Sequence, residues 1–210
     1  AQGQVIAFSV TSNLKDDVLQ RAINAHLPGD VALRQLATIR DGFRPRRDAV
    51  SRVYRYRIDQ GETRPVLGRD RVWYISQRLN IDLMRRAAEE FVGTHDFNAY
   101  TSGRQGSTWR SVYNVAVWRV GDSVYLQVEA NAFLYRMVRR MVADLVRVGR
   151  GVMEISEIRD ALKSGLRLKI QECAPANGLT LLHVQYSNRD SRYNVPDLAG
   201  EKVHSLQGKQ

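Results

Sequence analysis

The chain has 210 residues, 43% of them hydrophobic, with a formal net charge of +10 and a sequence pI near 10.1. This length and composition suit one domain, or two small ones, with a real hydrophobic core, and no apolar run approaches the length of a membrane span. The single cysteine, Cys173, excludes an internal disulfide and a cysteine-rich zinc site, and favours a reducing compartment such as the cytoplasm. Because arginine dominates the positive charge, the composition favours a nucleic-acid partner.

The first part of the chain alternates extended and helical patterns. Hydrophobic periodicity predicts a strand, an amphipathic helix, a strand, a loop with four arginines and a further strand, in that order, over 5–10, 16–27, 31–39, 40–49 and 50–59. The first strand begins almost at Ala1, which is unusual because a strand needs a neighbour to pair with.

The second part repeats this alternation. A helix is predicted over 80–93, with Asn80 as its N-cap, and a hairpin over 111–130 with a Gly-Asp turn. A long helix over 131–148, a short helix after Ser156 and a last strand over 179–187 follow.

These elements predict an α+β fold with a mostly antiparallel sheet flanked by helices. We expect residues 1–60 to be the remainder of an N-terminal domain, residues 61–188 a C-terminal domain, and residues 189–210 a polar tail.

Arg139 stands out in the long helix. At 100° per residue it falls on the apolar arc, whereas Arg136, Arg140, Asp144 and Arg147 cluster on what we expect to be the solvent face. Arg139 either extends to solvent from the margin of the apolar arc or holds an anion, which is a carboxylate or a phosphate.

The strand over 50–59 interleaves aromatic and basic side chains. Alternation places one set of side chains on one face, namely Arg52, Tyr54, Tyr56 and Ile58, and the other set on the opposite face, namely Val53, Arg55 and Arg57. Such a strand either stacks on a base while it holds the nucleic-acid backbone, or is half-buried with core tyrosines.

The histidines favour no catalytic or metal site. The four of them, His26, His95, His183 and His204, are scattered, so no metal site is predicted. His95 and Asp96 are adjacent at a helix end, where a turn or capping role is expected.

Several segments together resemble the TruA-type tRNA pseudouridine synthases. "SRVYRYRI", "GTHDF", "STWRSV", "NAFLYRMVRR" and "APANGLTLLHVQY" are similar to the family's R-x-Y-x-Y-x-I, G-x-H-D-F, T-x-R, N-A-F-x-x-x-M-V-R and A-P-x-x-G-L-x-L-x-x-V-x-Y motifs, in the same order. "AQGQV" fits the end of a further motif, R-T-D-A-G-V-H-A followed by x-G-Q-V.

The resemblance implies the pseudouridine synthase fold, with two pseudo-twofold-related domains of which the N-terminal one is incomplete here. It also implies a cytoplasmic, homodimeric isomerase that converts uridines at positions 38–40 of the tRNA anticodon stem-loop, with no cofactor, metal or membrane. Tyr54 and Leu179 would hold the flipped base, Arg52 and Arg110 would bind substrate, and Arg139 would pair with the catalytic aspartate.

That aspartate belongs to the R-T-D-A-G-V-H-A motif and would precede Ala1. We therefore expect an N-terminally truncated synthase that is inactive alone. The alternatives are a non-catalytic RNA-binding module on the same scaffold, and a basic structural protein whose arginines serve solubility.

Overall fold

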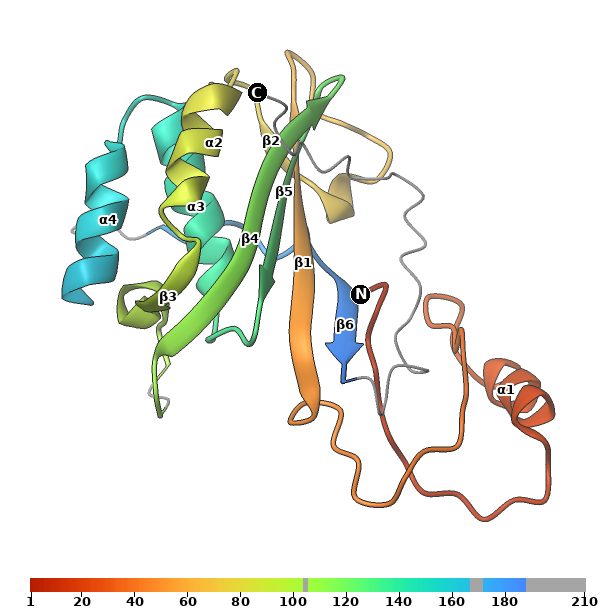
Figure 1. The fold of residues 1–210 in the computed structure, drawn as a ribbon. Coiled ribbons are helices and arrows are strands. Elements are labelled where there is room, and N and C mark those ends of the chain that lie inside the picture. Colours follow the sequence, from red (N-terminus) through yellow and green to blue (C-terminus); the bar gives the residue numbers. More distant parts are fainter. Residues whose placement is uncertain (104–105, 167–171, 188–210) are drawn as a thin grey trace, which may run out of the picture.

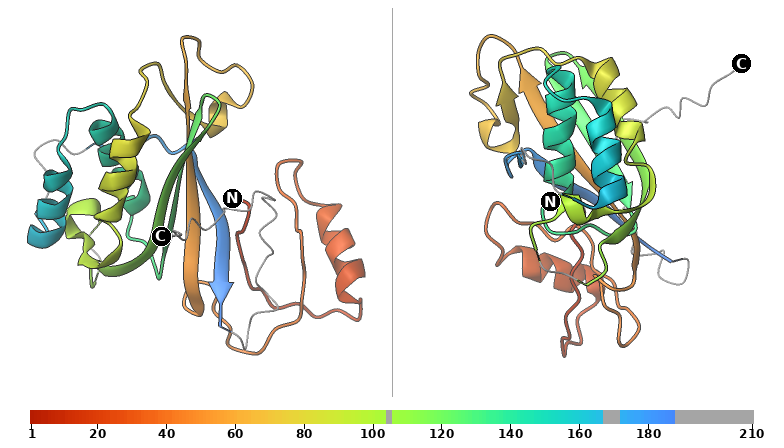
Figure 2. Two further views of the ribbon diagram at one scale, coloured as in Figure 1. Left: turned by 45° about the horizontal axis from the view of Figure 1, so that its top comes forward. Right: turned by 90° about the vertical axis from the view of Figure 1, so that its left-hand side faces the viewer.

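The computed structural model describes residues 1–103, 106–166 and 172–187. Within them, six strands form one sheet, and helices α2, α3 and α4 lie together on one of its faces (Figures 1 and 2). The strands are β1 (Ala49–Gln60), β2 (Trp73–Ile75), β3 (Gly93–Asp96), β4 (Trp109–Val120), β5 (Ser123–Ala130) and β6 (Leu179–Tyr186). The helices are α1 (Asp16–Asn24), α2 (Ile81–Glu89), α3 (Met137–Gly149) and α4 (Ile155–Ser164), with short 3-10 turns η1 (Arg69–Arg71) and η2 (Phe97–Tyr100).

Strand β1 organises the sheet, whose order is β2-β1-β5-β4-β3. One edge of β1 pairs with β5, and the other edge is shared by β6 and the short β2. All of these pairings are antiparallel except that between β1 and β2. The predicted α+β class with a mostly antiparallel, helix-flanked sheet is therefore confirmed.

Local sequence signals explain the best-predicted elements. The side chain of Asn80 accepts hydrogen bonds from the backbone amides of Asp82 and Leu83, both at 3.1 Å, so the predicted N-cap of α2 is confirmed. The predicted hairpin is β4 and β5, joined at Gly121 and Asp122. Gly121 has φ +57°, a left-handed conformation that glycine adopts without steric cost.

The prediction for the long helix was wrong in two respects. The helix begins at Met137 rather than at 131, after Arg136 takes a left-handed conformation with φ 62°. Its expected solvent face is also largely covered, because Arg140, Asp144 and Arg147 are buried. Arg140 explains why: its guanidinium donates to the carbonyl oxygen of Thr101, so the segment around η2 covers this face.

The prediction of two strands near the N-terminus, over 5–10 and 31–39, was also wrong. In the described residues both segments are irregular and lie with α1 on the side of the sheet away from α2, α3 and α4 (Figure 2). The division near residue 60 stays a prediction, and the predicted tail over 189–210 lies outside the described residues.

Two hydrophobic clusters stabilise this arrangement. The larger lies between the sheet and α2, α3 and α4, and the smaller is formed by Phe43, Val184 and Tyr186 on the other side. Val5 and Ile39 pack against the smaller cluster, which anchors the N-terminal segments to β6. Burial of apolar surface at this scale is the main driving force for folding.

Candidate active site

The two tyrosines of β1 have different surroundings. Tyr56 is fully buried, and its hydroxyl donates to the carbonyl oxygen of Pro175 at 2.7 Å. Tyr54 is half-buried and packs edge-on against Phe133, with ring centroids 5.1 Å apart. Tyr56 is thus a core residue, whereas Tyr54 keeps part of its ring accessible. Burial raises the pKa of the Tyr54 phenol, and the positive charge of Arg52 opposes that rise.

The opposite face of β1 carries an arginine–aromatic ladder. The guanidinium carbon of Arg55 lies 5.3 Å from the centre of the Trp118 ring, and that of Arg57 lies 6.0 Å from the centre of Tyr125. Trp118 and Tyr125 stack on each other at 5.5 Å. Arg55 and Arg57 therefore stabilise the sheet through cation–π contacts on the face that α2, α3 and α4 leave uncovered.

Arg139 is half-buried in α3 and is bound to the segment before β6. Its Nε donates to the carbonyl oxygen of Ala174 at 2.5 Å, and the amide of Ala174 donates to the carbonyl oxygen of Arg139 at 3.1 Å. Among the described residues, no carboxylate forms an ion pair with Arg139. The Nη groups of Arg139 donate no hydrogen bond to any described residue. The charge of Arg139 acts on the Tyr56 phenol and opposes the rise in its pKa that burial causes.

Leu179 completes the group around β1. It is the first residue of β6 and pairs with Tyr56, while Leu181 pairs with Tyr54. Leu179 is half-buried and packs against the larger hydrophobic cluster. The structure thus brings three predicted site residues, Tyr54, Leu179 and Arg139, to one region, at β1 and at the β6 and α3 segments beside it.

Arg52 and Arg110 hold main-chain carbonyl groups. Arg52 donates to the carbonyl oxygens of Arg46, Ala49 and Asn131, the last at 2.5 Å. Arg110 donates to the carbonyl oxygens of Ser107 at 2.8 Å and of Trp109 at 2.6 Å. Burial lowers the pKa of both guanidinium groups. Their contacts stabilise loops at one end of the sheet, and substrate binding by them stays a prediction.

Asn131 is a residue that sequence reasoning missed. Its side-chain oxygen accepts from the amides of Ser111 at 3.0 Å and Ala132 at 2.8 Å, and its main-chain oxygen accepts from Arg52. It therefore connects β4, the end of β5 and β1. The predicted helix over 131–148 hid this role, although an asparagine directly after a strand is a common signal for a turn.

His95 and Asp96 have the structural role predicted for them. The Asp96 side chain accepts from the amide of Asn98 at 3.0 Å and caps η2, and a ring nitrogen of His95 lies 3.0 Å from the carbonyl oxygen of Val92. In the described ranges, no group of three or more His, Cys, Asp or Glu residues could hold a metal ion. Across the same residues, no helix is long and apolar enough to cross a bilayer.

Residues 87–187 match the model of the family described as tRNA pseudouridine synthase, so this part of the chain has the sequence of a pseudouridine synthase. The chain is also 36% identical over 190 residues to a protein named tRNA pseudouridine synthase A from Fervidobacterium nodosum, covering 89% of this chain and 77% of that one. Proteins of the same name from Limosilactobacillus reuteri and Geotalea daltonii are 34% identical over 196 residues and 37% identical over 188 residues, covering 91% and 89% of this chain and 77% of each relative. The chain therefore belongs to the family of tRNA pseudouridine synthases, which are isomerases.

Proposed function

We propose that this protein converts uridine to pseudouridine in tRNA, at positions 38–40 of the anticodon stem-loop. Membership of the family carries this proposal, and the net charge of +10 supports a polyanionic substrate. We further propose that it works as a homodimer in the cytoplasm.

The reaction exchanges one bond within the nucleotide. The N1–C1′ bond of uridine breaks, a C5–C1′ bond forms, C5 loses a proton and N1 gains one. Because no electrons or groups come from outside, the reaction needs neither a cofactor nor a metal. The target uridine must leave the base stack to be reached, which costs a few kcal/mol.

The residues around β1 suit the flipped nucleotide. The accessible part of the Tyr54 ring would stack on the uracil, and Leu179 would form an apolar wall beside it. The Nη groups of Arg139 would hold a catalytic carboxylate in its ionised form, since an arginine fork binds carboxylate oxygens in pairs. Arg52 and Arg110 would bind substrate through the guanidinium N–H groups that do not already donate to main-chain carbonyl oxygens.

The carboxylate is the aspartate of the R-T-D-A-G-V-H-A motif, which residues 1–210 do not contain in full. Since no described carboxylate pairs with Arg139, we propose that a polypeptide of residues 1–210 alone is inactive.

Tritium release tests the proposed conversion of uridine to pseudouridine and the proposed inactivity of residues 1–210 alone. The polypeptide is incubated with tRNA that carries tritium at C5 of its uridines, and pseudouridine formation releases that tritium to water. We expect no release with residues 1–210, and release with a polypeptide in which the complete motif precedes Gly3. Replacing the motif's aspartate by asparagine should abolish it.

Two outcomes would contradict this scheme. Release by residues 1–210 themselves would show that the carboxylate lies elsewhere. If the extended polypeptide binds tRNA but releases no tritium, the non-catalytic RNA-binding module is the better description. Binding should weaken steeply with salt in either case, because phosphate contacts release counterions.

A further inference from the structure

The turn between β5 and α3 lies against the candidate site. Phe133, in the middle of this turn, packs on Tyr54, with ring centroids 5.1 Å apart. Leu134 is buried in the larger hydrophobic cluster, and the hydroxyl of Thr101 donates to the carbonyl oxygen of Tyr135 at 3.3 Å. The turn is therefore fixed beside Tyr54, so binding through its exposed side chains requires little further ordering of the chain.

Two neighbouring side chains of this turn, Tyr135 and Arg136, stay outside the packing. Tyr135 is 53% exposed, and Arg136 is exposed as well. The guanidinium carbon of Arg136 lies 5.0 Å from the centre of the Tyr135 ring, which is a cation–π contact. Arg136 forms no ion pair with any described carboxylate. The pair thus presents an aromatic ring and an uncompensated positive charge to solvent.

The backbone of Arg136 indicates that its side chain is needed. Its φ of 62° is left-handed, and every other positive φ among the described residues belongs to a glycine. Glycine adopts this conformation without the steric cost that a Cβ atom brings. An arginine that bears this cost without an ion pair to a described carboxylate is expected to serve a ligand.

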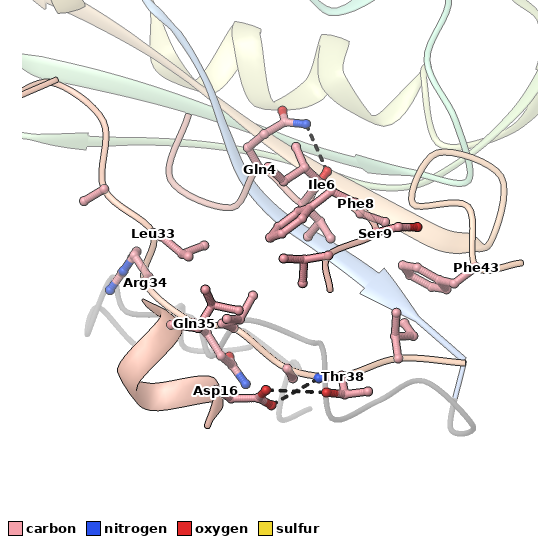
Figure 3. A pocket seen from close by; sticks show the side chains of 18 of the residues that line it. Gln4, Ile6, Phe8, Ser9, Asp16, Leu33, Arg34, Gln35, Thr38 and Phe43 are labelled. Carbon is pink, nitrogen blue, oxygen red and sulfur yellow. Dashed lines mark hydrogen bonds between the residues drawn. The ribbon is translucent and has the colours of Figure 1, made fainter. Parts of the chain in front are cut away.

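Other arginine-bearing surfaces are less suitable for a nucleic acid. On the open face of the sheet, Arg57 pairs with Asp59 at 2.8 Å. Arg55 on the same face donates to the side chain of Gln127 at 3.0 Å. The pocket shown in Figure 3 has acidic as well as basic side chains, namely Asp16, Asp30, Asp41, Arg34 and Arg40. A phosphate backbone favours basic groups that no acid compensates, and Arg136 is such a group among the described residues.

We propose that Tyr135 and Arg136 bind a tRNA nucleotide that flanks the target uridine. The Tyr135 ring stacks on the base of this nucleotide, and the guanidinium of Arg136 holds its phosphate. Arg136 precedes Arg139 by three residues, about one helical turn, and Phe133 of the same turn contacts Tyr54. This inference rests on the proposed function, since it takes tRNA as the substrate and both Tyr54 and Arg139 as parts of the active site.

The salt dependence of RNA binding tests the role of Arg136. The probe is a tRNA anticodon stem-loop with a uridine at position 38, and the protein is the full 210-residue chain. Arg136→Gln should reduce the magnitude of the slope of log affinity against log salt concentration by about 0.7–1, because one phosphate contact is lost. Arg86→Gln, at an exposed arginine of α2, is the matched control and should leave the slope unchanged. An unchanged slope for Arg136→Gln, or an equal reduction for Arg86→Gln, overturns the proposal.

Photocrosslinking tests the stacking on Tyr135. The same RNA carries 5-iodouridine, placed in turn on each side of the target uridine, and ultraviolet light joins this base to an aromatic ring that stacks on it. Mass spectrometry should locate the crosslink at Tyr135 for one of the two positions. Tyr135→Phe should keep the crosslink, whereas Tyr135→Leu should lose it and bind the RNA at least about fivefold more weakly. A crosslink that never includes Tyr135, or a parent chain that binds no RNA, overturns the proposal.

Arg136→Gly separates RNA binding from folding. Glycine adopts the left-handed conformation without strain, so urea unfolding should show this variant to be at least as stable as the parent chain. It should nevertheless bind RNA with the reduced slope of Arg136→Gln. A clearly less stable Arg136→Gly variant would assign a structural role to the side chain and overturn the proposal.

Tritium release by the extended polypeptide is measured separately. Release together with an unchanged slope for Arg136→Gln refutes this inference alone, whereas the absence of release refutes the proposed function.

Discussion

Arg139 and Ala174 are joined by a reciprocal pair of hydrogen bonds: the Arg139 Nε donates to the Ala174 carbonyl at 2.5 Å, and the Ala174 amide donates to the Arg139 carbonyl at 3.1 Å. The neighbouring Pro175 carbonyl accepts from the Tyr56 hydroxyl at 2.7 Å. Helix α3, the segment before β6 and strand β1 are thereby fixed to one another. The direction in which the Nη groups of Arg139 point depends on this connection, and within the described part of the chain these groups donate to no residue.

Replacing Arg139 by alanine should lower the free energy of unfolding by about 1–3 kcal/mol, because the buried carbonyl of Ala174 loses a charged donor. Arg139→Lys keeps the charge but lacks the Nε–H group, so it should lose most of the same amount. Urea unfolding measures both changes. Arg86→Ala, an exposed arginine on α2, serves as the control and should change stability by less than about 0.5 kcal/mol. A neutral Arg139→Ala variant would mean that this hydrogen bond contributes nothing.

The two tyrosines of β1 should respond differently to loss of the hydroxyl. Tyr56→Phe leaves the Pro175 carbonyl without its donor and should cost about 1–2 kcal/mol. The Tyr54 hydroxyl forms no hydrogen bond with a described residue, so Tyr54→Phe should be neutral within about 0.5 kcal/mol. Thermal and urea unfolding of the two variants are compared directly. Equal losses would contradict the assignment of Tyr56 to the core and Tyr54 to the site. In an active, longer polypeptide, Tyr54→Phe should also retain activity if stacking is the function of this ring.

The sequence predicted well those elements whose signals are local. The Asn80 cap and the Gly121 turn depend on side chains and backbone conformations within a few residues, so the pattern alone located them. Burial of the charged face of α3 depends on which other elements pack against that face, and no local sequence pattern contains this information. For the same reason the helical wheel placed Asp144 in water, although the structure buries it.

The N-terminal segments illustrate the other limit of sequence reasoning. Residues 5–10 have a strand-like alternation, but a strand exists only when a neighbouring backbone pairs with it.

The candidate site was also only partly predictable from the sequence. The motifs identified Tyr54, Leu179 and Arg139, which the structure brings to one region, but they gave no indication that Asn131 holds Arg52 in place.

Close packing between Gly178 and Tyr56 gives a further test. A Cβ atom at Gly178 would lie 2.5 Å from the Tyr56 ring and 2.8 Å from the carbonyl oxygen of Arg57, so neither neighbour can move aside easily. Gly178→Ala should therefore cost at least about 1–3 kcal/mol through overpacking. Gly29→Ala is the matched control, since a Cβ there meets nothing within 4 Å, and it should be neutral or slightly stabilising. A tolerated Gly178→Ala would show that the segment before β6 is not held against β1.

Buried Asp144 should make stability depend on pH. Burial raises the pKa of Asp144 from 3.8 to about 6, and Tyr100 and Arg147, which lies 3.6 Å away, limit the rise. A carboxyl group whose pKa is higher in the folded state stabilises that state below the unfolded pKa, and this contribution is lost as the pH rises through the folded pKa.

Between pH 4 and pH 6.5, Asp144 alone should thus lower the free energy of unfolding, by on the order of 2–3 kcal/mol. Asp144→Asn cannot ionise, so its free energy of unfolding should rise by that amount relative to that of the parent chain between pH 4 and pH 6.5, whatever its absolute value. Urea unfolding at half-unit pH intervals measures both profiles, and the difference between them removes the contribution of the other carboxylates. Parallel profiles would mean that Asp144 titrates in the folded protein as it does in the unfolded chain.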